Sequence, residues 1–177
     1  MNKKLIPFIT AKNLFEIPVD FYKKIGVKNL LLDLDNTLDS YLDKVPTKRT
    51  IDYVNLLKEQ SLNVYIISNN KKKRVLKYAE KLDIPFLYKS FKPFSFKIKK
   101  FLLKNNFILN ETILIGDQIL TDIKAANNIG IKSIYLEKLV PIDQWTTRIN
   151  RVFEKPILKR LKSKNLLIDW RAKYGNH

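Results

Sequence analysis

The stretch LLLDLDNTL, residues 30–38, joins a short apolar run to two acids, an amide and a hydroxyl. A continuous apolar run ended by polar residues indicates a buried strand of a parallel sheet. Ligands of open α/β sheets bind beyond the carboxyl ends of the strands, where Asp33 and Asp35 are expected. Two carboxylates on one side of a buried strand need a cation or a proton-transfer role, unless they only cap the turn that follows.

The composition is that of a globular chain of 177 residues with a net charge of +17. Its length and its apolar content of 45% are typical of one domain with a sizeable core. The absence of cysteine excludes disulfides and thiolate metal sites, and a single, terminal histidine argues against a histidine-based triad. The positive charge favours an anionic partner such as phospholipid, nucleic acid or a phosphorylated small molecule. The positive charge is equally well explained by A+T-rich codon usage, because Lys far outnumbers Arg.

The pattern of apolar and breaker residues predicts strands that alternate with helices. An irregular lead-in precedes a short helix over 19–25, which Gly26 ends. This alternation predicts a single parallel sheet with helices packed on it, an α/β architecture. We expect strands over 28–34, 63–67, 86–88, 112–115 and 131–136, and helices over 47–61, 71–82, 93–105 and 121–128.

The C-terminal stretch 145–177 is strongly basic, with nine basic and two acidic residues. Pro156 is expected to divide it into a segment around 145–154 and a basic helix around 156–168. The apolar residues of that helix, including Ile168, would either pack on the domain or meet a membrane surface. No apolar run approaches the roughly 18 residues of a membrane span. We therefore expect a cytoplasmic protein, or one peripheral on the inner face of the membrane.

Polar side chains also follow the other predicted strands. Ser68 follows the second strand, Lys92 the third and Asp117 the fourth, with Asp122 five residues later. In a parallel sheet these ends meet at one edge, so four acids, a hydroxyl and an ammonium would assemble there. Carboxylates suit Mg²⁺, and a hydroxyl and an ammonium can stabilise phosphoryl oxygens. This set of groups favours phosphoryl transfer.

Three of these residues also have a simpler explanation. Ser68 could cap the helix that follows it, and Lys89 could occupy the place assigned to Lys92. Asp122 could be an acid in the first turn of a helix, where it favours the helix dipole. The choice depends on which side chains the fold brings together.

The four motifs together resemble those of haloacid-dehalogenase (HAD) superfamily phosphatases. They are DLDNTL at 33–38, a hydrophobic residue and Ser at 67–68, Lys92 before a helix, and GDQILTD at 116–122. Their order and their positions at strand ends match that superfamily. The resemblance implies a Rossmann-like HAD three-layer sandwich with a central parallel sheet.

The resemblance also implies a role for each matching residue. Asp33 would be the nucleophile and Asp35 the general acid and base. Ser68 and Lys92 would bind the phosphoryl group. The implied Mg²⁺ site consists of Asp33, the backbone carbonyl of Asp35, and Asp117, with Asp122 orienting these ligands.

The spacing of the motifs bears on the substrate. Only 32 residues separate Asp35 from Ser68, and 23 separate Ser68 from Lys92. These intervals hold one helix each and leave no room for the cap domain that many HAD enzymes insert, an arrangement typical of subfamily IIIA. An uncapped site predicts a large substrate or another surface that covers it. We expect substrate contacts from Thr37, Asn69, Arg148 and Arg151.

The chain further resembles the bacterial YqeG-type branch, which is similar to mitochondrial phosphatidylglycerophosphate phosphatases. This resemblance rests on the lead-in at 13–38, YKSFKP at 88–93 and TRINRVFEKPI at 147–157. It implies a Mg²⁺-dependent phosphatase that acts through an aspartyl-phosphate and converts phosphatidylglycerophosphate to phosphatidylglycerol. The alternatives are a phosphatase of nucleic-acid or nucleotide phosphates and a non-catalytic scaffold that binds RNA or the ribosome. We expect a lead-in packed on the core (1–27), a catalytic domain (28–140) and a basic helical extension (141–177).

Overall fold

The computed structural model describes residues 3–137 and 145–175, and the side chains of 145–149 are left out. Within these residues, parallel strands form one sheet in the order β1-β6-β5-β2-β3-β4. The predicted α/β fold with a central parallel sheet is confirmed. The strands are β1 (Ile9–Ala11), β2 (Asn29–Leu32), β3 (Asn63–Ile67), β4 (Phe86–Leu87), β5 (Thr112–Gly116) and β6 (Lys132–Leu136).

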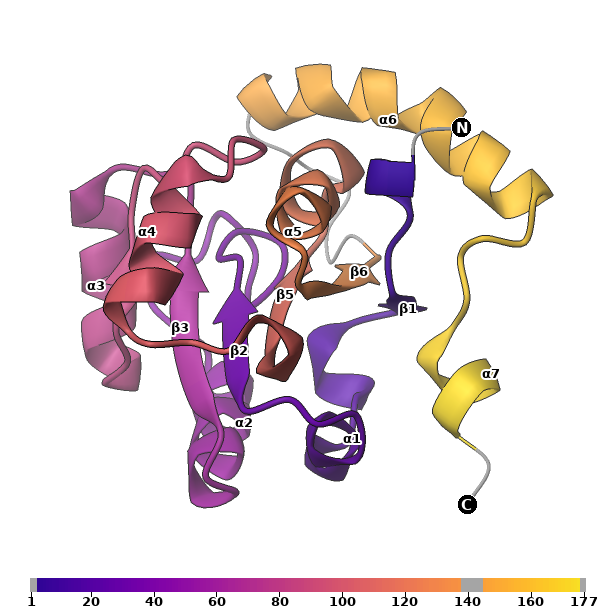
Figure 1. Ribbon diagram of the computed structural model, residues 1–177. Coiled ribbons are helices and arrows are strands. Elements are labelled where there is room, and N and C mark those ends of the chain that lie inside the picture. Colours follow the sequence, from indigo (N-terminus) through magenta and orange to yellow (C-terminus); the bar gives the residue numbers. More distant parts are fainter. Residues whose placement is uncertain (1–2, 138–144, 176–177) are drawn as a thin grey trace.

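Helices cover both faces of the sheet because its central strands are apolar on both sides (Figure 1). In β2, Leu30 and Leu32 pack into one core cluster and Leu31 into another, as alternation along a strand requires. The first cluster is covered by α1 (Val19–Lys24), α2 (Lys48–Glu59) and α3 (Lys72–Leu82), and the second by α4 (Phe96–Lys104) and α5 (Lys124–Ile129).

The helix ends follow local chemistry in part. Thr47 caps α2, since its side chain accepts from the N–H of Thr50 at 3.4 Å. The segment expected as one helix over 121–128 instead begins with a π-helix, η4 (Ile119–Ile123), that runs into α5. The 3₁₀-helices are η1 (Lys3–Leu5), η2 (Leu14–Glu16) and η3 (Leu109–Glu111).

The lead-in contributes an edge strand, so the prediction of an irregular segment is wrong for residues 9–11. β1 pairs with β6, and Ile9 lies opposite Ile134. On its other side, the N–H of Thr10 donates to the carbonyl of Ile168 at 2.8 Å. A strand of three residues is too short to show an alternating pattern in the sequence.

The prediction that Pro156 divides the C-terminal stretch is also wrong. One continuous helix, α6 (Trp145–Ser163), contains Pro156, and α7 (Trp170–Tyr174) follows it. The loss of one backbone hydrogen bond at proline is offset by tertiary packing, because Glu154 and Leu161 are buried on either side of it. Ile168 lies beyond the end of α6 rather than on its apolar face.

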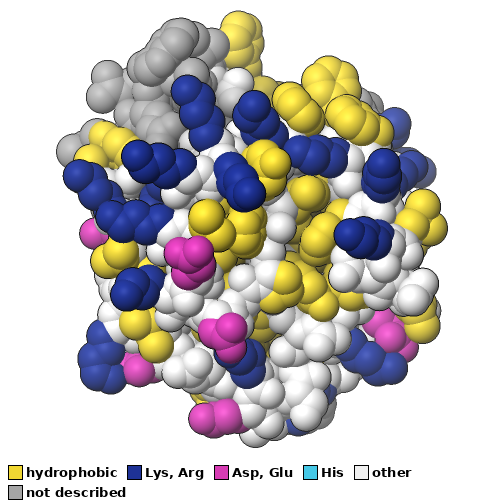
Figure 2. Space-filling model, turned by 90° about the vertical axis from the view of Figure 1, so that its left-hand side faces the viewer, with side chains coloured by type: hydrophobic (Ala, Val, Ile, Leu, Met, Phe, Trp, Pro, Cys, Tyr) yellow, Lys and Arg dark blue, Asp and Glu magenta, His cyan; other side chains and the backbone are white. Residues whose placement is uncertain are grey.

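α6 crosses the molecule at the end of the sheet to which β2 and β3 point (Figure 1). It packs through Leu161, which joins a cluster with Ile119 and Ile123 of η4. None of the helices in residues 3–137 and 145–175 is long and apolar enough to cross a membrane. Lys and Arg side chains greatly outnumber acidic ones on the face shown in Figure 2.

Candidate active site

Asp33 directly follows β2, at the carboxyl end of the sheet. Its N–H donates to the carbonyl of Ile115 at 2.9 Å, so pairing with β5 extends to this residue and fixes it. Its carboxylate accepts from Lys92 Nζ at 2.6 Å. The same ammonium donates to the carbonyl of Ile67 at 2.8 Å and pairs with Asp122 at 2.7 Å. Lys92 therefore lies buried between two carboxylates from different elements.

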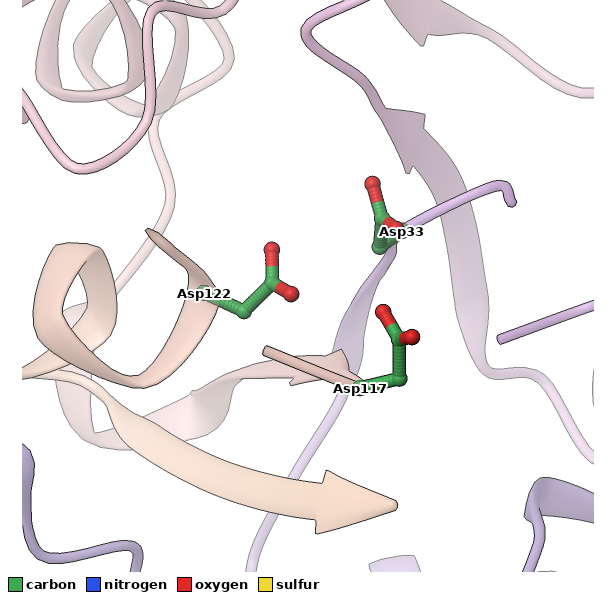
Figure 3. A group of neighbouring side chains, drawn as sticks. All are labelled: Asp33, Asp117 and Asp122. Atoms are coloured by element: carbon green, nitrogen blue, oxygen red, sulfur yellow. The ribbon is translucent and has the colours of Figure 1, made fainter. Parts of the chain in front are cut away.

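Three buried acids meet beside this lysine. Asp33, Asp117 and Asp122 each offer a carboxylate oxygen, and these oxygens all lie within 4.8 Å of one another (Figure 3). Asp117 follows β5, and Asp122 reaches back from η4 to accept from the N–H of Gln118 at 3.1 Å. Gly116 permits this approach, because a Cβ atom there would lie 2.3 Å from the Asp122 Cγ.

Burial dominates the electrostatics of these acids. It raises the pKa of Asp33 to about 7, although Lys92 opposes the shift, and it raises the pKa of Asp117 well above its usual value, although Arg151 opposes that shift. Burial lowers the pKa of Lys92, but its two carboxylate partners, Asp122 and Asp33, raise it by more. A nearby positive charge therefore stabilises the ionised form of each of these two acids, Lys92 for Asp33 and Arg151 for Asp117.

If every acid of the site were ionised, its negative charges would outnumber its positive ones. One oxygen of Asp117, Oδ1, is buried without a hydrogen-bond partner. Buried charge of this kind requires a compensating cation or a proton. Five carboxylates face three basic groups, an excess of two negative charges: Asp33, Asp35, Asp117, Asp122 and Glu154 against Arg74, Lys92 and Arg151.

Asp35 lies at the mouth of the same pocket and has its own partners. Its carboxylate accepts from Arg74 at 2.7 Å and from the side chain of Asn70. The chain then turns at Asn36, whose φ of 65° is a left-handed conformation that Asn tolerates. Asp33 and Asp35 are thus held by different groups, a lysine for the first and an arginine with an amide for the second.

Ser68 and Asn69 follow β3 and line the pocket. Ser68 Oγ accepts from the N–H of Asn70 at 3.1 Å, whereas the N-cap residue of α3 is Lys71. The helix-cap explanation of Ser68 therefore does not apply. Asn69 binds the loop that carries the site lysine: it accepts from the N–H of Lys92 at 2.8 Å and donates to its carbonyl at 2.9 Å.

The remaining alternatives are also resolved by geometry. Lys92 rather than Lys89 reaches Asp33, and Lys89 is exposed. Asp122 does lie in the first turn of a helix, but it also pairs with Lys92 and belongs to the acid cluster. Lys92 and Asp122 therefore lie together at the acid cluster.

α6 supplies a second buried ion pair beside the acids. Arg151 donates to the backbone carbonyl of Asp117 at 2.6 Å and also to its carboxylate. Glu154 is fully buried, accepts from Arg151 at 3.2 Å, and accepts from the N–H of Leu120 at 2.7 Å. These contacts join α6 to the loop between Asp117 and Asp122.

Three predicted substrate contacts are not placed in the pocket. Thr37 is fully buried and does not line it, and the side chain of Arg148 lies outside the described residues. Arg151 does not line it either, because its guanidinium binds Asp117 and Glu154. Arg74, which binds Asp35, and Glu154, which binds Arg151, are absent from the sequence prediction. Glu154 carried one signal: it is the single acid of a basic helix and lies three residues after Arg151.

The pocket between these groups is small and polar. Its volume is about 260 Å³, less than most sites for drug-sized ligands. Tyr41, Gln118 and Asn150 are among the other residues that line it. A phosphoryl group and the atoms next to it fit such a space, whereas a long substrate must extend outside it.

A family model described as mitochondrial PGP phosphatase matches residues 1–141. The chain belongs to this family. Probable phosphatase YqeG of Bacillus subtilis (strain 168) is 35% identical, over 93% of this chain and 95% of its own length. The probable mitochondrial phosphatidylglycerophosphatase of Schizosaccharomyces pombe is 25% identical, over 92% of this chain and 87% of that protein.

The fold of this PGP phosphatase family member occurs in solved structures. The cobalt-bound deoxy-D-mannose-octulosonate 8-phosphate phosphatase of Haemophilus influenzae matches with a TM-score of 0.52 and 14% identity, over 64% of this chain and 70% of its own. Family and fold together identify a HAD-type phosphatase, a phosphoric monoester hydrolase. The predicted superfamily and enzyme class are confirmed.

Proposed function

We propose that this phosphatase is a Mg²⁺-dependent enzyme that hydrolyses phosphatidylglycerophosphate to phosphatidylglycerol through an aspartyl-phosphate on Asp33. The observation that carries the chemistry is the pairing of Asp33 with Lys92 beside a cluster of buried acids. The lipid substrate rests on the family match and on the small, open pocket. The enzyme would act from the cytoplasmic side on lipid in the inner leaflet.

The acids suit a Mg²⁺ ion because hard carboxylate oxygens are its usual protein ligands. Asp33 and Asp117 would hold it with the backbone carbonyl of Asp35, and Asp122 would orient them. The excess negative charge of the site and the unpartnered oxygen of Asp117 support this assignment. When bound, the ion would neutralise charge on the phosphoryl group.

Each of the pocket residues then has a role in one or both chemical steps. A carboxylate oxygen of Asp33 attacks phosphorus, the bond to the ester oxygen breaks, and Asp35 protonates the leaving alkoxide. Asp35 next takes a proton from water, whose oxygen attacks the phosphoaspartate and releases inorganic phosphate. Lys92 and Ser68 stabilise the phosphoryl oxygens in both steps. Arg74 holds the Asp35 carboxylate in position throughout.

The proposal is tested with the purified full chain and three substrates: phosphatidylglycerophosphate in detergent micelles, 3′-phosphorylated RNA and a sugar phosphate. We expect the highest kcat/KM for the lipid, loss of turnover in EDTA and recovery when Mg²⁺ is added back. Asp33→Asn should lower kcat by more than about 10³-fold and prevent trapping by beryllofluoride. Asp52→Asn removes an exposed acid of α2 and should have no effect.

Each part of the proposal has its own contrary result. Full activity in EDTA would overturn the role of the metal, and turnover by Asp33→Asn would remove that residue from its role. A preference for RNA over the lipid would overturn the substrate while leaving the chemistry intact.

A further inference from the structure

Three phenylalanines are exposed together on the segment that carries the site lysine. We call residues 88–97, a loop that runs into the first turn of α4, the aromatic loop. Phe91 is 49% exposed, Phe94 68% and Phe96 63%, and the rings of Phe91 and Phe96 stack with centroids 6.0 Å apart. Large apolar side chains gathered on the surface usually mark an interaction site.

The aromatic loop is fixed rather than loosely attached. Lys97 Nζ donates to the carbonyls of Tyr88 and Lys89, both at 2.8 Å, and the N–H of Phe94 donates to the carbonyl of Phe91 at 2.8 Å. Phe91 has a φ of 59°, a conformation that a bulky side chain rarely adopts. Strain of this kind persists where surrounding contacts impose it, and it gathers at functional sites.

Several exposed lysines lie near the phenylalanines in the chain. Lys89, Lys99 and Lys100 are exposed on and beside the loop. The N–H of Lys89 donates to the carbonyl of Asn70 at 2.9 Å, which brings the loop next to the lysines 71–73 at the start of α3. Neither α3 nor α4 has an acid in its first turn, where the helix dipole would favour one. Figure 2 shows hydrophobic side chains among basic ones toward the end of the molecule at which α6 lies.

The loop is coupled rigidly to the pocket. Lys92, which binds Asp33, lies between Phe91 and Phe94 in sequence. The side chain of Asn69 holds both the N–H and the carbonyl of Lys92, and it also accepts from Ser90 Oγ at 2.8 Å. A surface that receives the phenylalanines therefore lies at a fixed position relative to the acids.

We propose that the aromatic loop and its lysines dock the enzyme on an anionic phospholipid bilayer. This inference rests on the proposed lipid phosphatase function and names the surface from which that substrate is taken. Aromatic side chains insert to the depth of the headgroup and acyl boundary, while lysines attract anionic headgroups. A single-stranded nucleic acid fits less well, because bases need free aromatic faces and Phe91 and Phe96 stack on each other.

Vesicle binding tests the inference without any turnover. The Asp33→Asn full chain is sedimented with vesicles of phosphatidylcholine alone or of phosphatidylcholine with phosphatidylglycerol, none containing phosphatidylglycerophosphate. We expect binding to the anionic vesicles alone. The added change Phe94→Ala with Phe96→Ala should weaken binding at least about 10-fold. Phe94→Trp should retain it, because Trp favours the membrane interface.

The matched control is Leu103→Ala, which removes a 77% exposed apolar side chain from the far end of α4. It should leave vesicle binding unchanged. Equal binding of all variants, or binding to RNA instead of anionic vesicles, would overturn the docking surface. An enzyme that hydrolyses the lipid without binding vesicles refutes only the docking. One that binds vesicles through the loop without hydrolysing the lipid refutes only the substrate.

Discussion

Glu154 gives the most informative test of how α6 contributes to the site. This carboxylate is fully buried and holds two groups, the N–H of Leu120 at 2.7 Å and the guanidinium of Arg151 at 3.2 Å. Through Arg151 it is linked to Asp117, a member of the acid cluster. Glu154→Ala removes the acceptor and leaves both donors in place.

The size of the effect follows from these contacts. A hydrogen bond to a charged group contributes about 1.5–3 kcal/mol. Because Arg151 keeps its bonds to Asp117, we take the low end for each of the two bonds and expect a loss of about 3 kcal/mol. For a chain of this length that loss lowers the Tm by about 6–12 °C. Disturbing a residue that orients a metal ligand typically costs 10–100-fold in metal affinity or activity.

The assay is Mg²⁺ titration of phosphatase activity, with thermal unfolding of the same samples. Glu154→Ala should raise the Mg²⁺ concentration for half-maximal rate about 10–100-fold. Glu154→Gln keeps an oxygen that accepts from Leu120 but loses the charge that Arg151 faces. Its Mg²⁺ requirement and its Tm should therefore lie between those of the wild type and Glu154→Ala. Lys155→Ala, an exposed neighbour, is the control. An unchanged Tm together with an unchanged Mg²⁺ requirement would refute a role for α6 in holding the acids.

Two further substitutions probe the buried charges and the glycine. Lys92→Met leaves two buried carboxylates without their shared cation and should destabilise the metal-free protein by about 3–5 kcal/mol. Denaturant unfolding measures this loss of stability. A loss smaller than that caused by replacing an exposed lysine would contradict the prediction. Gly116→Ala places a Cβ atom 2.3 Å from the Asp122 Cγ and should reduce activity at least about 10-fold by displacing that acid; wild-type kinetics would show that Asp122 can move without cost.

Three residues of the site could be predicted because each of them directly follows a strand. Asp33, Ser68 and Asp117 each follow an apolar run, and parallel strands bring such ends to one edge. Lys92 was predictable as part of a motif, although the carbonyl of Ile67 and the second acid that it binds were not. The end of a strand can be recognised from neighbouring residues in the sequence. The groups that a long side chain such as Lys92 contacts depend on the tertiary fold and cannot.

The contributions of α6 and β1 could not be predicted, because both depend on tertiary packing. Glu154 and Arg151 act only because α6 docks on the loop at 117–122, and nothing near them in the chain fixes that register. Pro156 carries a strong local signal for a break, and packing on both sides overrides it. β1 has three residues, too few for a periodic pattern.

The edge strand β1 also constrains the order in which the chain is completed. Its partner β6 is synthesised last among the strands. Ile9 pairs with Ile134, which lies far from it in the sequence. During synthesis the first strand must therefore wait until almost the whole sheet exists, while β2, β3 and β5 can already pair. The closing segment at Ile168 then covers β1 in turn. A chain without its first dozen residues would present the edge of β6 to other molecules and tend to aggregate.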